Sequence, residues 1–313
     1  MSDKPHLLIQ GATLPSGVPP SAAGPFPPHL RALLAALAPG DRIDCADDSP
    51  AGPFELALAQ AHGLPGAPGS IPWAAFETGT VGRPCAWVHP CHWQVGADHI
   101  LLAPDDSLAL DEATSRELMA ALAPWFLEDG ITLQYQDGRP THWLAQGEAF
   151  RGLSTMSLDR AAGRRLTPAF FNPSGDTAAM LRRLQNEMQM LLYTHPATEA
   201  RQERGLAPIN SFWVTGAGEL AQALLPAAGV CAETRLQAPA RAGDAAGHAQ
   251  AWRAIDAERC AALLAQVRAG APARLTLCGD NAAQTWGPAR SSAWRRAAGA
   301  LGLGRPSLAE LAL

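Results

Sequence analysis

The sequence predicts an α/β protein in which a mixed sheet is flanked by helices. Helical and strand patterns alternate through the second half of the 313-residue chain, and an apolar strand pattern opens the first half at residues 6–12. Hydrophobic residues make up 47% of the chain and charged residues 17%. That composition suffices for the core of one large domain or two smaller ones.

The elements of the first half follow from spacing and end signals. The helices are marked by leucines at helical spacing and by signals at their ends. These signals are prolines in first turns, glycines after last turns and Asp111 as a cap. The expected elements are a strand at 6–12, helices at 29–37 and 53–62, extended structure at 86–103 broken at Pro90, a helix at 112–126, and a hairpin of 131–135 with 141–145.

The second half alternates more regularly. Residues 167–176 form the best boundary candidate, because proline, glycine and polar residues gather there. The expected elements after it are a helix at 176–195, a strand at 209–215, a turn at 216–218, a short helix at 219–225, a long helix at 247–269 and a strand at 274–278.

Charge divides the chain into two expected lobes. Residues 1–165 carry a net charge of −8 and residues 166–313 a net charge of +3, which sum to the −5 of the whole chain. We therefore expect an acidic N-terminal α/β lobe at 1–165 and a C-terminal α/β lobe at 166–313. An acidic solvated surface is the alternative explanation of this asymmetry.

Composition excludes several classes of protein. Lys4 is the single lysine, so a phosphate-binding loop and Schiff-base chemistry lack their lysine. The net charge of −5 argues against a nucleic-acid partner, and the apolar runs are too short to span a membrane. The start MSDKPHLL has no signal-peptide layout and the six cysteines show no C-x-x-C spacing, so we expect a cytoplasmic protein.

Metal-ligand residue types concentrate in residues 85–99. His89, His92 and His99 lie there with two cysteines, and Asp280 follows the strand at 274–278, where α/β sheets place ligands. These residues are the candidate metal ligands. The alternative is a tryptophan-rich strand edge with hydrogen-bonded histidines, and for Asp280 a simple Asp-Asn turn.

A second candidate site surrounds the helix at 176–195. Glu187 falls inside the apolar stripe of this helix, His195 closes the same face, and Arg201 or Arg204 could pair with the carboxylate. Gly216 and Gly218 follow an apolar strand, so their backbone N–H groups could hold an anion. A structural Glu–Arg bridge and plain turn geometry are the alternatives.

The stretch 184–218 carries a distinctive pattern, N-E-x-Q-M-L-L, then H-P, R and I-N-S-x-W-x-x-G-x-G. Its positions are Asn186, Glu187, Gln189, Met190, His195, Pro196, Arg201, Asn210, Ser211, Trp213, Gly216 and Gly218. This pattern resembles that of a family of proteobacterial RpfE-type regulatory proteins, and residues 92–110 and 154–164 are similar to the same family.

This family is in turn distantly similar to cofactor-independent, archaeal-type phosphoglycerate mutases, which implies a degenerate alkaline-phosphatase-like fold in two lobes. Such mutases use a Ser or Thr nucleophile and two divalent metals held by Asp and His. Here the first strand ends Gln10-Gly11-Ala12-Thr13 without an acid. Asn281 stands beside Asp280, where the resemblance leads one to expect a histidine. The resemblance therefore implies shared ancestry of fold more than mutase activity.

The leading hypothesis is a regulatory or ligand-sensing protein without a cofactor, with its catalytic residues unknown. It would bind an anionic metabolite, or a protein partner, through a pocket at Glu187, His195, Arg201, Asn210 and Trp213 and the 216–218 turn. The alternative is a phosphomutase or phosphohydrolase that uses Mn or Zn and acts on a phosphoglycerate-like substrate. A scaffold without a small-molecule site is the third possibility.

Overall fold

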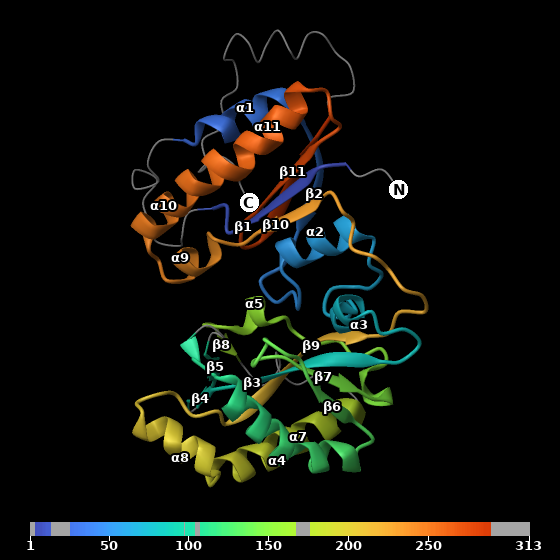
Figure 1. The fold of residues 1–313 in the computed structure, drawn as a ribbon, viewed down its shortest axis with the longest axis vertical. Helices are drawn as coiled ribbons and strands as arrows, with labels where there is room; N and C mark the ends of the chain where they lie inside the picture. Colours follow the sequence, from blue (N-terminus) through green and yellow to red (C-terminus); the bar gives the residue numbers. More distant parts are fainter. Residues whose placement is uncertain (1–3, 14–25, 97, 104–106, 167–175, 289–313) are drawn as a thin grey trace. The chain divides into compact units, whose positions relative to one another are not determined.

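The structure, a computed structural model, describes residues 4–13, 26–96, 98–103, 107–166 and 176–288. The chain folds into two compact units (Figure 1). Unit 1 consists of residues 1–47, 52–63 and 226–313, and unit 2 consists of residues 48–51 and 64–225. None of the described helices combines the length and apolar character that crossing a bilayer requires.

This division differs from the expected lobes at 1–165 and 166–313. Residue 165 lies inside unit 2, and unit 1 contains both the beginning of the chain and residues 226–313. Strand pairing is the physical reason. Strand β1 (His6–Gln10) pairs with β10 (Val230–Glu233) on one side and β11 (Arg274–Cys278) on the other. The expected boundary segment 167–175 lies outside the described residues.

Unit 1 contains a five-stranded mixed sheet in the order β10-β1-β11-β12-β2. Strands β10, β1 and β11 are parallel, whereas β12 (Ala282–Gly287) is antiparallel to both β11 and β2 (Ala38–Asp44). The helices of this unit are α1 (Pro28–Ala36), α2 (Pro53–His62), α9 (Gln237–Arg241), α10 (Ala245–Ile255), the π-helical turn η4 (Asp256–Cys260) and α11 (Ala261–Arg268).

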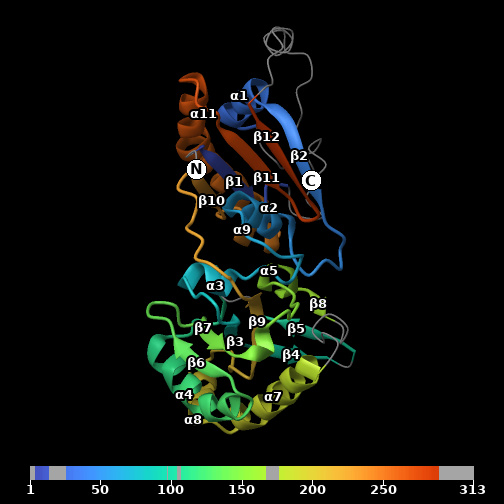
Figure 2. The same cartoon turned by 90° about the vertical axis from the view of Figure 1, so that its right-hand side faces the viewer.

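Helices cover both faces of this sheet, as the positions of α1 and α11 on one side and α2 on the other show (Figure 2). Leu7 and Ile9 of β1 pack with α1, α10 and α11 on one face, and Leu8 packs with α2 on the other, because side chains alternate along a strand. The predicted mixed sheet flanked by helices is therefore confirmed.

Unit 2 contains an antiparallel sheet in the order β6-β7-β3-β9 and a small sheet in the order β4-β5-β8. The strands are β3 (Cys85–Cys91), β4 (Trp93–Val95), β5 (Ile100–Leu102), β6 (Thr132–Tyr135), β7 (Trp143–Gln146), β8 (Arg165–Leu166) and β9 (Ser211–Gly218). The helices are α3 (Trp73–Thr78), α4 (Glu112–Glu128), the 3-10 turn η3 (Glu148–Phe150), α5 (Leu158–Ala161), α7 (Asp176–Tyr193) and α8 (Pro196–Glu203).

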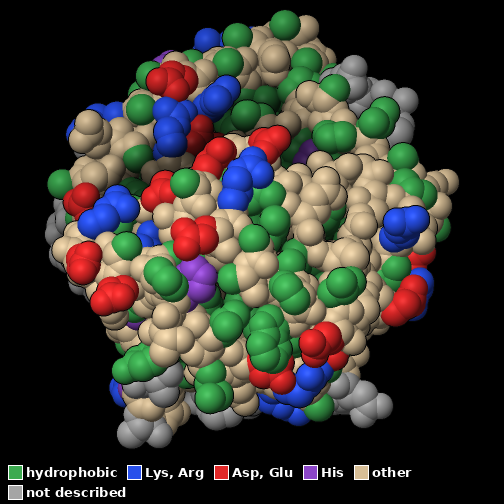
Figure 3. Space-filling model, turned by 60° about the horizontal axis from the view of Figure 1, so that its bottom comes forward, with side chains coloured by type: hydrophobic (Ala, Val, Ile, Leu, Met, Phe, Trp, Pro, Cys, Tyr) green, Lys and Arg blue, Asp and Glu red, His purple; other side chains and the backbone are tan. Residues whose placement is uncertain are grey.

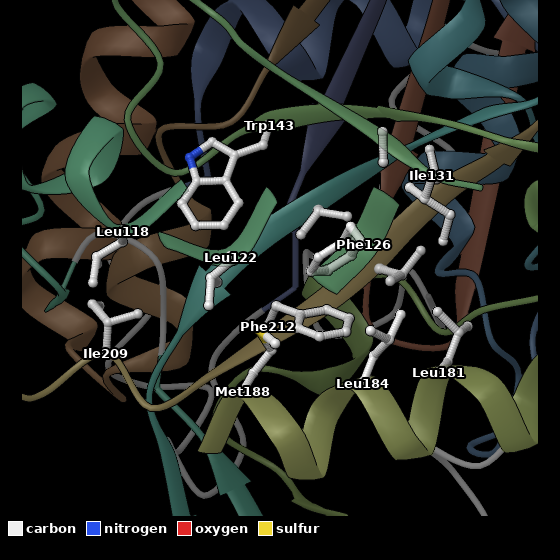
Figure 4. Close-up of a cluster of buried hydrophobic side chains, with 14 of the residues drawn as sticks. Leu118, Leu122, Phe126, Ile131, Trp143, Leu181, Leu184, Met188, Ile209 and Phe212 are labelled. Atoms are coloured by element: carbon white, nitrogen blue, oxygen red, sulfur yellow. The ribbon is translucent and has the colours of Figure 1, made fainter. Parts of the chain in front are cut away.

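Helices α4 and α7 cover one face of the larger sheet. Their apolar side chains meet residues of β3, β7 and β9 in the largest core cluster of this unit (Figure 4). The fully buried members include Leu118, Leu122, Phe126, Trp143, Leu184, Met188 and Phe212. The opposite face, which carries Trp87, packs against the short helix α3.

Several expected elements differ from those observed. Pro90 does not break the extended segment, because it lies inside β3 and needs no N–H donor there. Strands β2, β10 and β12 carry no clear pattern in the sequence. Trp125 is partly exposed and Phe126 is buried, so Phe126 is the inward residue of that pair on α4.

A buried carboxylate joins the helices on one face of unit 1. Asp256, in η4, accepts hydrogen bonds from the backbone N–H groups of His29 (3.2 Å) and Leu30 (2.8 Å), and its carboxylate lies 2.9 Å from Nδ1 of His29. The first N–H groups of a helix have no partner within the helix, and Pro27 offers α1 no side-chain cap. Asp256 therefore caps α1 from a neighbouring helix.

We predict that Asp256→Ala lowers the free energy of unfolding by about 2–3 kcal/mol, because it leaves backbone donors of α1 without an acceptor. Urea denaturation followed by circular dichroism measures this loss. Asp244→Ala is the matched control, since Asp244 caps its own helix α10 from an exposed position, and we expect it to cost about 1 kcal/mol. Equal losses in the two variants would contradict this account of η4.

Candidate functional site

Polar side chains gather on the α3 side of the larger sheet of unit 2. Strand β3 places Trp87 and His89 on this face, and register pairing sets Thr215 of β9 beside them. The connection between β6 and β7 adds Arg139 and His142. We call these five residues, Trp87, His89, Arg139, His142 and Thr215, the imidazole site.

His89 is 2% exposed, and both of its ring nitrogens are hydrogen-bonded. Nδ1 lies 3.0 Å from the carbonyl oxygen of Thr141, and a carbonyl can only accept, so Nδ1 carries the proton. Nε2 is then an acceptor, and the hydroxyl of Thr215 donates to it across 2.7 Å. One backbone carbonyl therefore fixes the tautomer of His89 and the direction of the Thr215 hydroxyl.

His142 lies edge-on against two neighbouring rings. Its ring centroid is 4.5 Å from that of His89 and 5.6 Å from that of Trp87. Nδ1 of His142 lies 3.0 Å from the hydroxyl oxygen of Thr141. Nε2 is consequently the ring nitrogen left for another partner.

Arg139 brings a positive charge to this group. Its guanidinium lies 4.8 Å from the ring centroid of Trp87, and one of its nitrogens donates to the Glu77 carboxylate at 2.9 Å. The Arg139 side chain is 41% exposed, so solvent and solutes reach it. A guanidinium has five N–H donors, and the bond to Glu77 leaves most of them available.

Burial keeps both imidazoles uncharged. Desolvation is the main cause that holds the pKa of His89 well below its ordinary value, with repulsion from His142 and Arg139 added to it. The pKa of His142 falls to about 4, again chiefly through burial and secondly through Arg139. Near neutral pH the site therefore combines one cation with two neutral rings.

The other histidines of the expected metal set have separate partners. Nδ1 of His92 lies 2.8 Å from the carbonyl of Pro208, and Nδ1 of His99 lies 2.7 Å from the carboxylate of Asp98. Asp280 belongs to the β11–β12 turn of unit 1, whereas the histidines belong to unit 2. Among the described residues, no three His, Cys, Asp or Glu side chains gather so that they could hold a metal ion.

The expected ligand residues on α7 and α8 have structural partners. Glu187 lies at the edge of the apolar stripe and pairs with Arg183 at 3.4 Å, in place of the expected Arg201 or Arg204. His195 accepts a hydrogen bond from the N–H of Ala197 at 3.2 Å and so caps α8.

Arg201 is buried, with 1% of its surface exposed. It donates to the carbonyls of Ala207 (2.9 Å), Ala109 (3.4 Å) and Leu108, which anchors the loop before α4.

Asn210 and Trp213 also bind backbone groups. The side-chain amide of Asn210 accepts from the N–H of Trp93 at 2.7 Å and donates to its carbonyl at 2.9 Å. The indole N–H of Trp213 donates to the carbonyl of Met156 at 2.8 Å. These residues hold the small sheet of unit 2 against the larger one, and the contacts do not gather them into one pocket with Arg201.

The predictions of a turn at 216–218 and of a short helix at 219–225 are wrong. Gly216 and Gly218 lie inside β9, and Gly218 pairs with Cys85 after a register shift. Residues 219–225 form no helix. Gly216 has a φ of +61°, and a Cβ there would meet that of Trp73 at 3.0 Å. The glycines therefore serve close packing on α3, and they present no helix N-terminus to an anion.

The sequence showed one member of the imidazole site and missed four. The sequence marks His89 as a candidate metal ligand, whereas no motif in the sequence points to Trp87, Arg139, His142 or Thr215. The available signal was the expected hairpin of 131–135 with 141–145, which places His142 at the start of a strand. The pairing of that strand with β3 runs from Val88↔Trp143 to Cys85↔Gln146, more than 50 residues apart in the sequence, and local periodicity does not contain this information.

Comparisons with solved structures give distant likenesses, including two that cover most of this chain. A cofactor-independent phosphoglycerate mutase from Thermoplasma acidophilum is 14% identical, with 91% of this chain and 89% of that chain covered, at a TM-score of 0.35. The PH0037 protein of Pyrococcus horikoshii is 12% identical, with 91% and 87% covered, at a TM-score of 0.40. No family model and no curated protein matches the sequence. Likenesses at these scores contribute nothing to the assignment of a site.

The lowered pKa of His142 predicts a loss of stability in acid. The unfolded ring takes up a proton below about pH 6.5 and the folded ring only near pH 4, so the free energy of unfolding falls as the pH drops through this window. In His142→Gln the free energy of unfolding should fall less between pH 7.5 and pH 4.5 than in the wild type, by about 2 kcal/mol. Urea denaturation at several pH values in this range measures the difference. The same dependence on pH in both proteins would show that burial does not lower the pKa of His142.

Proposed function

We propose that this chain is a ligand-sensing regulatory protein that binds a small anionic metabolite at the imidazole site. The observation that carries the proposal is the partly exposed Arg139 guanidinium beside the uncharged ring of His142. The resemblance to RpfE-type proteins supports the regulatory part of the proposal, and a cytoplasmic location belongs to the same proposal.

The available donors favour an anion. Arg139 offers its remaining guanidinium N–H groups, and a guanidinium binds carboxylate or phosphate with charge-assisted hydrogen bonds. Nε2 of His142 adds a donor when Nδ1 accepts from Thr141.

One ring beside these donors favours a ligand with a carbon skeleton. His142 is only partly buried and lies edge-on against Trp87 and His89, so its neutral ring is the aromatic surface that a short carbon chain can reach, whereas Trp87 and His89 are 3% and 2% exposed. A phosphorylated hydroxy acid, with anionic groups at the ends of a short chain, fits this combination. 3-Phosphoglycerate is the probe that we choose.

The same site offers one feature of a group-transfer enzyme. The Thr215 hydroxyl lies 2.7 Å from the His89 imidazole, which is the geometry of a nucleophile and its base. An effective general base, however, needs a pKa near the working pH, and burial holds the pKa of His89 well below its ordinary value. Recognition is therefore favoured over transfer to Thr215.

The competing phosphotransferase hypothesis has its own test. Protein purified without a His tag is analysed for Mn and Zn and assayed for turnover of phosphoglycerates with each metal added. If the protein turns over phosphoglycerates and Thr215→Val abolishes that turnover, the function of this site is group transfer and not ligand sensing. Turnover that depends on added metal and survives Thr215→Val would instead support the metal-dependent alternative.

We predict that Arg139→Gln weakens the binding of 3-phosphoglycerate at least tenfold, because charge-assisted hydrogen bonds contribute about 1.5–3 kcal/mol. Isothermal titration calorimetry measures the dissociation constant. Arg151→Gln is the matched control, since Arg151 is also partly exposed in unit 2 and paired with Glu148 and Glu219, and it should leave the constant unchanged. Equal affinities of wild type and Arg139→Gln would refute the site.

We predict that Glu77→Gln has the opposite effect. The Glu77 carboxylate occupies one guanidinium nitrogen of Arg139 at 2.9 Å and repels an incoming anion. Its neutral isostere should tighten the binding of 3-phosphoglycerate a few-fold in the same calorimetric titration, because exposed charge pairs contribute about 0.2–1 kcal/mol. Weaker binding would show that Glu77 supports the ligand and does not compete with it.

A further inference from the structure

The hydroxyl oxygen of Thr215 is the part of the imidazole site that can accept a hydrogen bond from a ligand. The Nδ1–H of His89 donates to the carbonyl of Thr141 at 3.0 Å, which leaves Nε2 of His89 as an acceptor 2.7 Å from the Thr215 oxygen. The Thr215 proton is therefore committed to His89. Because a hydroxyl has one proton and two lone pairs, Thr215 offers a ligand lone pairs only.

Thr215 is also within reach of a ligand, unlike the ring that orients it. His89 is 2% exposed, whereas Thr215 is only partly buried. Thr215 lies opposite Trp87 in the register of β9 with β3, so the two side chains share one face of the sheet. The guanidinium of Arg139 lies 4.8 Å from the ring centroid of the same Trp87. One small molecule can therefore contact both the cation and the acceptor.

The site thus presents two kinds of hydrogen-bonding group to a ligand. Arg139 and Nε2 of His142 donate, and they suit the oxygens of an anionic group. Thr215 accepts, so a carboxylate or phosphate oxygen placed against it would bring lone pairs together. An ammonium group there would lie near Arg139, whose carboxylate partner Glu77 is already engaged at 2.9 Å. A neutral hydroxyl group of the ligand meets neither obstacle.

The surface charge of the chain gives no general attraction for anions. The whole chain carries a net charge of −5, and Figure 3 shows acidic and basic side chains interspersed on one side of the molecule. Selection of a ligand therefore depends on short-range contacts within the imidazole site, where the direction of each hydrogen bond decides which groups fit.

We propose that Thr215 is the specificity-determining residue of the imidazole site and that it selects anions that carry a hydroxyl group. The inference rests on the proposed binding of an anion at Arg139. The ligand hydroxyl donates to the Thr215 oxygen while the anionic group binds the guanidinium. An analogue without that hydroxyl displaces water from the Thr215 oxygen and gives it no new donor, and a polar group left unpaired in this way lowers affinity.

Two probes that differ only in this hydroxyl test the proposal. 3-Phosphoglycerate carries a hydroxyl at its second carbon, and 3-phosphonooxypropanoate has the same chain and the same anionic groups without it. In calorimetric titrations of the full chain, the wild type should bind 3-phosphoglycerate about tenfold more tightly than the analogue. In Thr215→Val the two dissociation constants should become equal, because only the affinity for 3-phosphoglycerate falls.

Two further variants serve as controls. Thr215→Ser keeps the hydroxyl and should keep the preference for 3-phosphoglycerate. Thr132→Val removes a threonine hydroxyl from the exposed edge strand β6 of the same unit and should leave both dissociation constants unchanged. Circular dichroism of each variant checks that the fold is retained.

The outcomes separate this inference from the proposed function. If 3-phosphoglycerate does not bind, or binds equally well to Arg139→Gln, the anion site is refuted and the role of Thr215 falls with it. If 3-phosphoglycerate binds through Arg139 but the wild type does not prefer it to the analogue, the anion site stands and the inference is overturned. A preference that persists in Thr215→Val, or an equal loss of both ligands in that folded variant, also overturns it.

Discussion

The hydrogen bond between Nδ1 of His89 and the carbonyl of Thr141 is the constraint on which the imidazole site depends. It ties β3 to the loop that precedes β7 and fixes which ring nitrogen of His89 carries the proton. With that proton placed, the Thr215 hydroxyl has one direction in which to donate. The same loop carries Arg139 and His142, so a backbone contact that locks the loop also positions the cation and the second ring.

Polar residues of the 184–218 motif stabilise the backbone of unit 2 and do not form a binding site. Arg201 and Asn210 direct their polar atoms at backbone groups of loops and strand ends. Backbone donors and acceptors in such places must be satisfied when they are buried, and a long or bifunctional side chain does this at a distance. The spacing of these residues therefore reflects which backbone groups of unit 2 they bind. It gives no information on what the unit binds.

The sequence predicted the longer helices from local signals but missed several strands of the sheets, and particular residues explain why. Helix α2 begins at Pro53 and ends before Gly63, whose φ is +72°, and Asp111 caps α4 by accepting from Thr114. These are local signals. Strand β2 contains Pro39 and Gly40, which weaken a strand pattern, and it forms because β12 pairs with it at the edge of the sheet. The site depends likewise on the pairing of β3 with β7 and β9, which lies beyond any local window.

The low pKa of the buried histidines decides between recognition and reaction. A ring that stays neutral near pH 7 keeps one donor and one acceptor in fixed places. In His142 this leaves Nε2 to donate to a ligand, whereas both nitrogens of His89 already bind Thr141 and Thr215. The same low pKa makes proton abstraction unfavourable, because the protonated ring would have to exist inside an apolar site beside Arg139. Burial thus makes His89 a reliable hydrogen-bonding element and a weak base at once. The positive charge of Arg139 strengthens both effects, since it attracts an anion and disfavours imidazolium.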